Sequence, residues 1–212
     1  ENRLLARGPS QRLTGEMLRD NALVASGLLT KQIGGKSVNP YQPEGLWRVN
    51  GAAYTEDKGV NLYRRSLYTI WKRSVPHPTL ATFDAPARDV CTIRRQETNT
   101  PLQALLLLND PIYTETARAL GNEMLAYKKT TDGIAIAYKK LTGKTITNKE
   151  LNLLADLQKT EYQKFKENPS KIKGWLQTGA FTIDKGADKA LIAANAVVAN
   201  TIMNSDATIT KR

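Results

Sequence analysis

Cysteine and histidine are almost missing from this chain of 212 residues, which contains one of each, Cys91 and His77. A single cysteine excludes a disulfide within the chain. One cysteine with one histidine also excludes a Cys/His zinc site and the Cys-x-x-Cys-His motif that attaches haem c. We therefore predict that this chain holds no metal ion and no cofactor of its own. We expect Cys91 to be a small buried residue and His77 to lie in an exposed turn.

Long hydrophobic runs are missing as well. The apolar run at residues 104–108 is far shorter than the roughly 18 to 20 apolar residues that cross a bilayer. We therefore predict no membrane span. The opening ENRLLARGPSQRL has neither the apolar segment nor the small-residue cleavage site of a signal peptide. We expect it to begin inside a domain, so that the chain is an N-terminally truncated piece.

Compact catalytic motifs are also missing. The sequence has no Gly-rich phosphate-binding loop, no G-x-S-x-G and no H-E-x-x-H. Its net charge of +11 would suit a polyanion, but from Lys128 onward most lysines alternate with acidic and amide residues, a pattern typical of a solvated surface. Nucleic acid is therefore an unlikely partner, although a basic polyanion-binding module remains an alternative.

Apolar residues recur at helical spacing over most of the chain, which predicts an all-α fold. We expect one domain over residues 1–212, built as an irregular multi-helix array. Residues 31–61 contain too many Gly and Pro residues for regular structure and form a long ordered loop or a small irregular insertion. The helices are expected at residues 15–29, 61–74, 101–108, 111–127, 148–165 and 186–203.

The stretch TNTPLQALLLLNDP, residues 98–111, specifies a helix start most sharply. Thr100 is the expected N-cap, Pro101 the first helical residue, and Gln103 completes a Thr-x-x-Gln capping box. Residues 104–108 are apolar on every side, which predicts a helix surrounded by protein. Asp110 and Pro111 start the next helix in the same way, and Thr147 with Glu150 forms a second capping box.

A polar cluster precedes this helix. Buried charges must pair or face a cavity, so the cluster is either a site or a structural network. Asp84 is our candidate catalytic base, or else a cap, and Arg95 our second catalytic candidate. Of the adjacent pairs Arg64–Arg65 and Arg94–Arg95, we expect one member to pair inward and the other to be free. The substrate-binding candidates in these segments are Arg64, Arg65, Arg88, Arg94, Asn99 and Gln103.

Aromatic side chains supply a second set of candidates. A platform on which sugar rings stack could be formed by Tyr41, Trp47, Tyr63 and Trp71, with Gln42, Asn39 and Asn50 nearby to bond hydroxyls. The same residues could instead form a small hydrophobic core within the irregular segment. A shared substrate site predicts a pocket lined jointly by residues 39–47, 63–73 and 84–103, whereas a scaffold predicts polar groups satisfied internally and no concave site.

Several motifs together resemble a known family: Arg12, Leu13, Glu16, Arg19, Asp20, Ser26 and Gly27, then GGKSVNPYQPEGLW, YRRSLYTIWKR, FDAPARDVCTIRR and TNTPLQALLLLND. They are similar to planctomycete-specific domain one, the domain of unknown function at the C-terminal end of planctomycete-type cytochrome c proteins. The likeness covers nearly the whole chain and is strongest over residues 34–110.

This resemblance implies an extracytoplasmic multidomain protein, periplasmic or on the cell surface, with haem c in a neighbouring domain as partner. It implies that this domain contributes a substrate-binding or catalytic surface for carbohydrate oxidation or handling. The alternative is a noncatalytic scaffold that docks the haem domain.

Overall fold

Side-chain caps fix the starts of five helices, and Thr100, Asp110 and Thr147 are caps that the sequence predicts. Thr14, Thr100, Asp110, Thr147 and Asp188 each accept a hydrogen bond from a backbone N–H of the first turn. These donors have no partner within the helix, so the caps stabilise each start. The capping box between Thr147 and Glu150 is complete, with both reciprocal hydrogen bonds present.

The computed structural model describes residues 3–4, 6, 8, 10–184 and 186–211. Over this part of the chain the fold is mostly helical, as predicted, with one small antiparallel pair of strands, β1 (Gln11–Arg12) and β2 (Thr210–Lys211). The α-helices are α1 (Gly15–Ala25), α2 (Pro78–Thr82), α3 (Pro101–Asn109), α4 (Pro111–Glu123), α5 (Thr130–Thr142), α6 (Asn148–Glu167), α7 (Ile172–Gln177), α8 (Lys189–Met203) and α9 (Asp206–Ile209). The short 3₁₀ helices are η1 (Leu46–Asn50), η2 (Gly59–Tyr63), η3 (Ser66–Tyr68), η4 (Met124–Ala126) and η5 (Pro169–Lys171).

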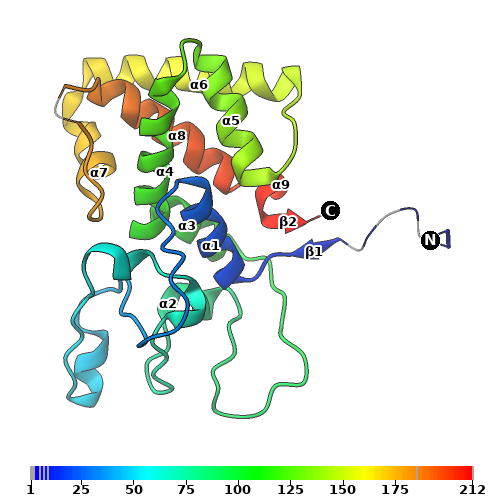
Figure 1. Cartoon of the computed structure of the whole chain (residues 1–212), viewed down its shortest axis with the longest axis vertical. Helices are drawn as coiled ribbons and strands as arrows, with labels where there is room; N and C mark the ends of the chain where they lie inside the picture. The colour runs from blue at the N-terminus through cyan, green and yellow to red at the C-terminus, as the bar shows by residue number, and fades with distance from the viewer. Residues whose placement is uncertain (1–2, 5, 7, 9, 185, 212) are drawn as a thin grey trace.

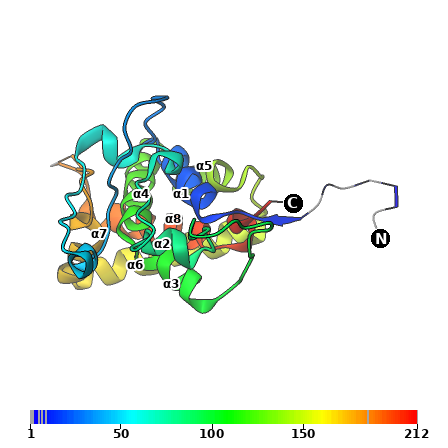
Figure 2. The same ribbon diagram turned by 90° about the horizontal axis from the view of Figure 1, so that it is seen from below.

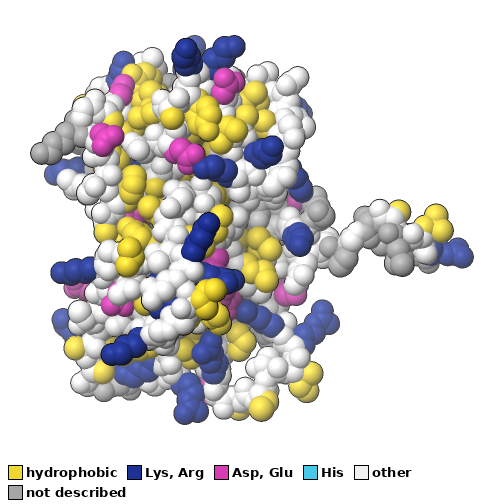
Figure 3. Space-filling model, viewed as in Figure 1, with side chains coloured by type: hydrophobic (Ala, Val, Ile, Leu, Met, Phe, Trp, Pro, Cys, Tyr) yellow, Lys and Arg dark blue, Asp and Glu magenta, His cyan; other side chains and the backbone are white. Residues whose placement is uncertain are grey.

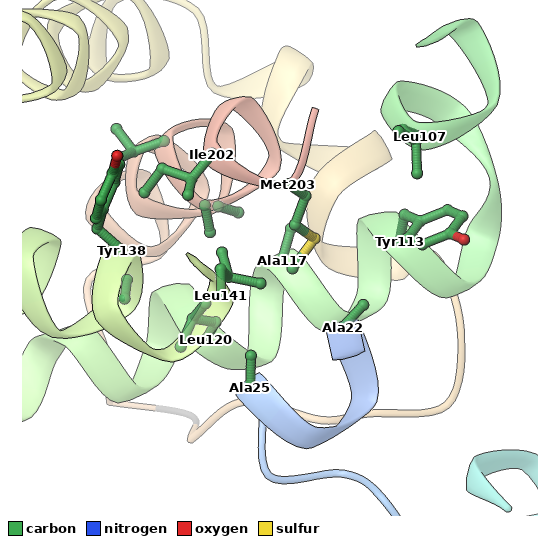
Figure 4. Packing of buried hydrophobic residues seen from close by; sticks show 14 of the residues in the cluster. Ala22, Ala25, Leu107, Tyr113, Ala117, Leu120, Tyr138, Leu141, Ile202 and Met203 are labelled. Atoms are coloured by element: carbon green, nitrogen blue, oxygen red, sulfur yellow. The ribbon is translucent and has the colours of Figure 1, made fainter. Parts of the chain in front are cut away.

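The core is centred on α4 and α8, which cross in the middle of the molecule (Figure 1). Gly121 permits this close crossing, because a Cβ at that position would overlap the backbone of α8 at Ala196. Ala117 and Leu120 of α4 pack with Ile202 and Met203 of α8 in the cluster drawn in Figure 4. Helices α1, α5 and α6 surround this centre, although the sequence predicts no helix at α5. A smaller second cluster joins α6 to α8 through Phe165, Ala190, Ala193 and Ala194.

Residues 31–61 are irregular, as predicted, but the irregular region extends further than expected. The helix predicted over residues 61–74 is wrong. Backbone hydrogen bonds join Val38 N to Tyr68 O at 2.8 Å and Ile70 N to Val38 O at 2.9 Å. These bonds hold the segment in an extended path next to Val38, interrupted by η2 and η3. Pairing with a distant segment therefore outweighs the local helical spacing of Tyr63, Leu67 and Ile70.

The leucine helix α3 is not the interior element that the sequence predicts. Leu107 is 1% exposed, but Leu105 and Leu102 are each 54% exposed and Leu108 is 41% exposed. The physical reason is position: α3 packs against α4 and α8 through one face and leaves its opposite face in solvent. An apolar composition on every side therefore does not guarantee burial on every side.

Four smaller expectations are also wrong. The first helix ends at Ala25 rather than Leu29, because Gly27 takes a left-handed conformation with φ of 74°. Helix α4 ends at Glu123 rather than at residue 127, and Tyr127 is exposed. Cys91 is exposed on the loop of residues 85–98, and His77 is buried with its Nε2 3.0 Å from Tyr41 O. That loop runs beside α2 and α3 in both Figure 1 and Figure 2.

None of the helices that the structure describes combines the length and the apolar character needed to span a membrane.

Candidate ligand-binding groove

An open groove of about 850 Å³ lies between the outer face of α1, residues 65–71 and the loop that carries Arg88 and Arg95. We call it the α1 groove. Its lining combines charged, polar, aromatic and aliphatic side chains: Thr14, Glu16, Met17, Asp20, Asn21, Val24, Leu29, Lys31, Ile33, Arg65, Ser66, Leu67, Thr69, Trp71, Leu80, Arg88 and Arg95. Four of the sequence candidates, Arg65, Trp71, Arg88 and Arg95, therefore meet at one concave surface.

Arg19 and Asp20 fix one wall of the α1 groove. The Arg19 guanidinium is buried and donates to Leu62 O at 2.8 Å and Arg64 O at 2.8 Å, so α1 holds the irregular segment in place. Asp20 Oδ1 accepts hydrogen bonds from the backbone N–H and the hydroxyl of Ser66, both at 2.7 Å. Burial lowers the pKa of Arg19 from its ordinary value, and the nearby Asp20 carboxylate opposes that change.

Arg95 fixes the opposite wall. Its terminal nitrogen lies 2.7 Å from Glu16 Oε2, and its Nε donates to Asp84 O at 2.8 Å. Burial alone would raise the pKa of Glu16, but hydrogen bonding and the charge of Arg95 outweigh it, and the pKa is lowered. The Glu16 carboxylate therefore stays charged and joins the loop to α1.

Asp84 and Gln103 lie behind this wall and organise the base of the loop. Both Asp84 carboxylate oxygens accept from the Thr98 hydroxyl, and Oδ2 also accepts from Thr98 N at 2.8 Å. Gln103 is 1% exposed; it accepts from Arg12 at 2.9 Å and donates to Thr82 O at 2.9 Å. The second half of a capping box needs the Gln103 oxygen to accept from the N–H of Thr100. That oxygen accepts from Arg12 instead, so the box predicted at Thr100 is not completed.

Trp71 and Arg88 form a stack at the edge of the α1 groove. The Trp71 indole N–H donates to Ala87 O at 3.0 Å, and the Arg88 guanidinium carbon lies 5.0 Å from the centre of the Trp71 ring. Arg88 has a φ of 63°, in the left-handed region that non-glycine residues rarely occupy. The hydrogen bond to Ala87 O therefore positions a strained residue over the indole.

The remaining arginine and amide candidates lie elsewhere. Arg64 is buried; it donates to Lys36 O at 3.0 Å and to Gly34 O at 2.5 Å, and its guanidinium stacks on Tyr68. Arg94 and Asn99 are exposed and do not line the α1 groove. One arginine of each adjacent pair points inward, as expected, but Arg65 is not free, since its Nε lies 3.8 Å from Asp20 Oδ2, and neither pair lies on a helix.

Gln42 and Trp47 belong to a different concavity. They line a second groove of about 500 Å³ formed by residues 42–58, in which the Trp47 and Tyr54 rings are 5.0 Å apart. Residues 39–47 therefore do not share a pocket with residues 63–73 and 84–103, contrary to the prediction. The aromatic platform is divided, with Trp71 in one groove and Trp47 in the other.

Sequence reasoning missed a buried polar cluster on α4. Glu115 and Arg118 are both 0% exposed, and Arg118 donates to the backbone oxygens of Trp175 and Phe181. Glu115 accepts from the Tyr63 hydroxyl at 2.8 Å and from Phe181 N at 2.5 Å. The available signal was an acid and a base three residues apart within a predicted helix of small residues, ETARALG.

Tyr41 completes this cluster instead of lining either groove. Its hydroxyl accepts from Ala180 N at 2.9 Å, and burial together with the charge of Glu115 raises the pKa of Tyr41 to about 12. Tyr41 thereby ties the irregular segment to the chain that follows α7.

The positive charge of the chain does not form a continuous patch on the face drawn in Figure 3. Lys and Arg side chains are interleaved there with hydrophobic and acidic side chains. This arrangement gives no support to a polyanion-binding surface on that face.

Comparison with protein families gives a match over most of the chain. Residues 1–158 match PSD1, a family described as a protein of unknown function (DUF1553), and every residue that lines the α1 groove falls within that range. No curated protein and no solved structure matches the chain. The resemblance carried by the sequence motifs is thus confirmed, and the chain belongs to the PSD1 family, the planctomycete-specific domain of unknown function.

Proposed function

We propose that the α1 groove binds a carbohydrate and that this domain works in an extracytoplasmic multidomain protein next to a haem-c domain. The observation that carries the proposal is the convergence of Arg65, Trp71, Arg88 and Arg95 on one concave surface with the carboxylates of Glu16 and Asp20. Sugar sites combine an aromatic face with charged groups that bond hydroxyls, and this lining has both.

The two residues expected to be catalytic take a positioning role in this proposal. Asp84 is engaged by Thr98 and Gln103, and Arg95 by Glu16 and Asp84 O, so together they hold the loop that presents Arg88. A base would need a carboxylate within reach of a bound hydroxyl proton, and Glu16 and Asp20 are the carboxylates that line the groove.

The haem c implied by the resemblance does not fit the residues of this chain. His77 is buried with Nε2 next to Tyr41 O, and Cys91 is the one cysteine. The described residues contain no group of three or more His, Cys, Asp or Glu that could hold a metal ion. The proposal therefore assigns haem to a neighbouring domain and derives no step through it.

Saccharide binding by two tryptophan variants tests the carbohydrate proposal. Trp71→Ala removes the aromatic face of the α1 groove, and Trp47→Ala removes the corresponding face of the second groove. Aromatic contacts contribute about 0.5–1.5 kcal/mol, so we expect Trp71→Ala to weaken binding on a glycan array about three- to tenfold. Trp47→Ala is the matched control and should leave binding unchanged. Equal effects of both changes, or binding by neither wild type nor variant, would reject the proposal.

A second candidate, a scaffold that docks the neighbouring haem domain, is favoured by exposed aliphatic side chains. Val24, Ile33 and Leu67 line the α1 groove and are 57, 86 and 74% exposed. The exposed leucines of α3 form another apolar surface. Hydrogen exchange of this chain alone and within its parent protein separates the two functions. Docking predicts that residues 101–109 or the groove become protected in the parent protein without any saccharide.

A further inference from the structure

The carboxylates that line the α1 groove have partners within the fold, whereas the cations that line it are more numerous than these carboxylates. The lining contains four cationic side chains, Lys31, Arg65, Arg88 and Arg95, and two carboxylates, Glu16 and Asp20. Arg95 neutralises Glu16 at 2.7 Å. Asp20 accepts two hydrogen bonds from Ser66 and lies 3.8 Å from both the buried Arg19 and the exposed Arg65. Both carboxylates are thus compensated, and because four cations line the groove against two carboxylates, the groove stays positive.

Arg65 is the first cation available to a ligand. Its side chain is 56% exposed, and its Nε lies 3.8 Å from Asp20 Oδ2, which is beyond hydrogen-bond distance. Its neighbour Arg64, by contrast, uses its guanidinium on backbone oxygens of residues 32–36. Within the described part of the chain, Arg65 thus forms one long ion pair with Asp20, and no hydrogen bond engages its guanidinium donors at the groove surface.

Arg88 is the second available cation. Its guanidinium carbon lies 5.0 Å from the centre of the Trp71 ring, and among the described residues no hydrogen bond engages its N–H groups. No carboxylate of the described residues lies within ion-pair distance of Arg88. The left-handed φ of 63° is unfavourable for arginine, and retained backbone strain is concentrated at ligand clamps and active sites.

We infer that the α1 groove selects saccharides bearing an anionic group, a carboxylate or a sulfate ester, which Arg65 and Arg88 hold in place. The inference rests on the proposed carbohydrate function and specifies its substrate class. A guanidinium group can form paired hydrogen bonds with a carboxylate or with a sulfate ester. Trp71 lies next to Arg88 and presents an aromatic surface to the sugar that carries the anionic group. Lys31 adds long-range attraction rather than a geometric contact.

Binding of the chain to matched oligosaccharides tests this inference. Neutral, carboxylated and sulfated oligosaccharides with the same linkages are compared for wild type, Arg65→Gln, Arg88→Gln and the control Arg94→Gln. Because a charge-assisted pair contributes about a tenfold or greater change in affinity, wild type should bind one anionic series at least about tenfold more tightly than the neutral one. Arg65→Gln and Arg88→Gln should each lose about that factor on the anionic series alone.

The outcomes separate the inference from the proposed function. Equal binding of neutral and anionic series would overturn the inference and leave carbohydrate binding in place, whereas binding of no series would overturn both. A loss in Arg94→Gln as large as in Arg65→Gln would show general charge attraction and also overturn the inference. If Arg88→Gln disturbs the loop, seen as faster hydrogen exchange of residues 85–98, Arg65→Gln decides the question.

Discussion

Arg95 and Glu16 lie 79 positions apart in the sequence, yet their side chains form an ion pair of 2.7 Å. This pair joins the long loop of residues 85–98 to α1, while Asp84 and Thr98 close the base of the loop. The loop therefore has a defined position although it contains no regular secondary structure. That position brings Arg88 to the edge of the α1 groove.

Replacing Arg95 should loosen this loop. Arg95→Gln removes the ion pair to Glu16 and the hydrogen bond to Asp84 O, and both partners are only partly exposed. We expect the free energy of unfolding to fall by about 1–2 kcal/mol, as measured by urea denaturation. The exposed neighbour offers a matched control, and Arg94→Gln should change stability by less than about 0.5 kcal/mol. Hydrogen exchange of residues 85–98 should rise in the first variant only; similar behaviour of the two would contradict the assigned pairing.

The same ion pair makes stability depend on acid pH. The pKa of Glu16 is lowered from the ordinary value of 4.5 by Arg95, after burial has opposed that shift. Glu16 therefore binds a proton more readily in the unfolded chain than in the folded one. Its contribution to the free energy of unfolding is fully present above about pH 4.5 and is lost as the pH falls through the lowered pKa. Melting temperatures measured between pH 3 and pH 6 should fall less steeply with acid in Glu16→Gln than in wild type. Identical slopes would show that Glu16 is not the group that titrates.

The buried pair on α4 should be far more sensitive than an exposed one. Arg118→Met leaves the Glu115 carboxylate without its cation at 0% exposure, and we expect a loss of about 3–5 kcal/mol in the free energy of unfolding. The double change Glu115→Gln with Arg118→Met should recover much of this loss, since no buried charge remains. Glu161 and Lys164 have the same three-residue spacing but an exposed lysine, so Lys164→Met should cost less than about 0.5 kcal/mol. A small effect of Arg118→Met would mean that water reaches Glu115.

Local signals predicted helix starts well because a cap and its first turn are contiguous in sequence. Thr100, Asp110 and Thr147 fix the entries of three helices, and the observed starts agree. Burial was predicted less well, because it depends on what lies opposite each face. Leu105 and Leu107 are chemically alike, but the side of α3 that meets α4 and α8 is decided by the rest of the fold.

The candidate site was also predicted only in part from the sequence, because its walls come from segments that are distant in the chain. The sequence supplied Arg65, Trp71, Arg88 and Arg95, but no local pattern marked α1 as one side of the groove. Spacing along the chain also does not distinguish Arg64 from Arg65. Their different environments arise from backbone pairing of residues 30 and 64, which no local pattern indicates.

Gly179 should be among the least replaceable glycines, because its backbone covers the Glu115 carboxylate. It has a φ of 76°, and a Cβ there would overlap the Glu115 carboxyl group. Gly143, which ends α5, has a similar φ of 71° with nothing within 4 Å of its Cβ position. Gly143→Ala should therefore lower the free energy of unfolding by about 1–2 kcal/mol, because alanine is strained at a positive φ. Gly179→Ala should cost about 1–3 kcal/mol more, since the buried carboxylate has to move. Guanidinium denaturation of the two variants measures the difference, and equal losses would mean that Glu115 turns away from Gly179 and that the carboxylate is not held by Tyr63 and Phe181.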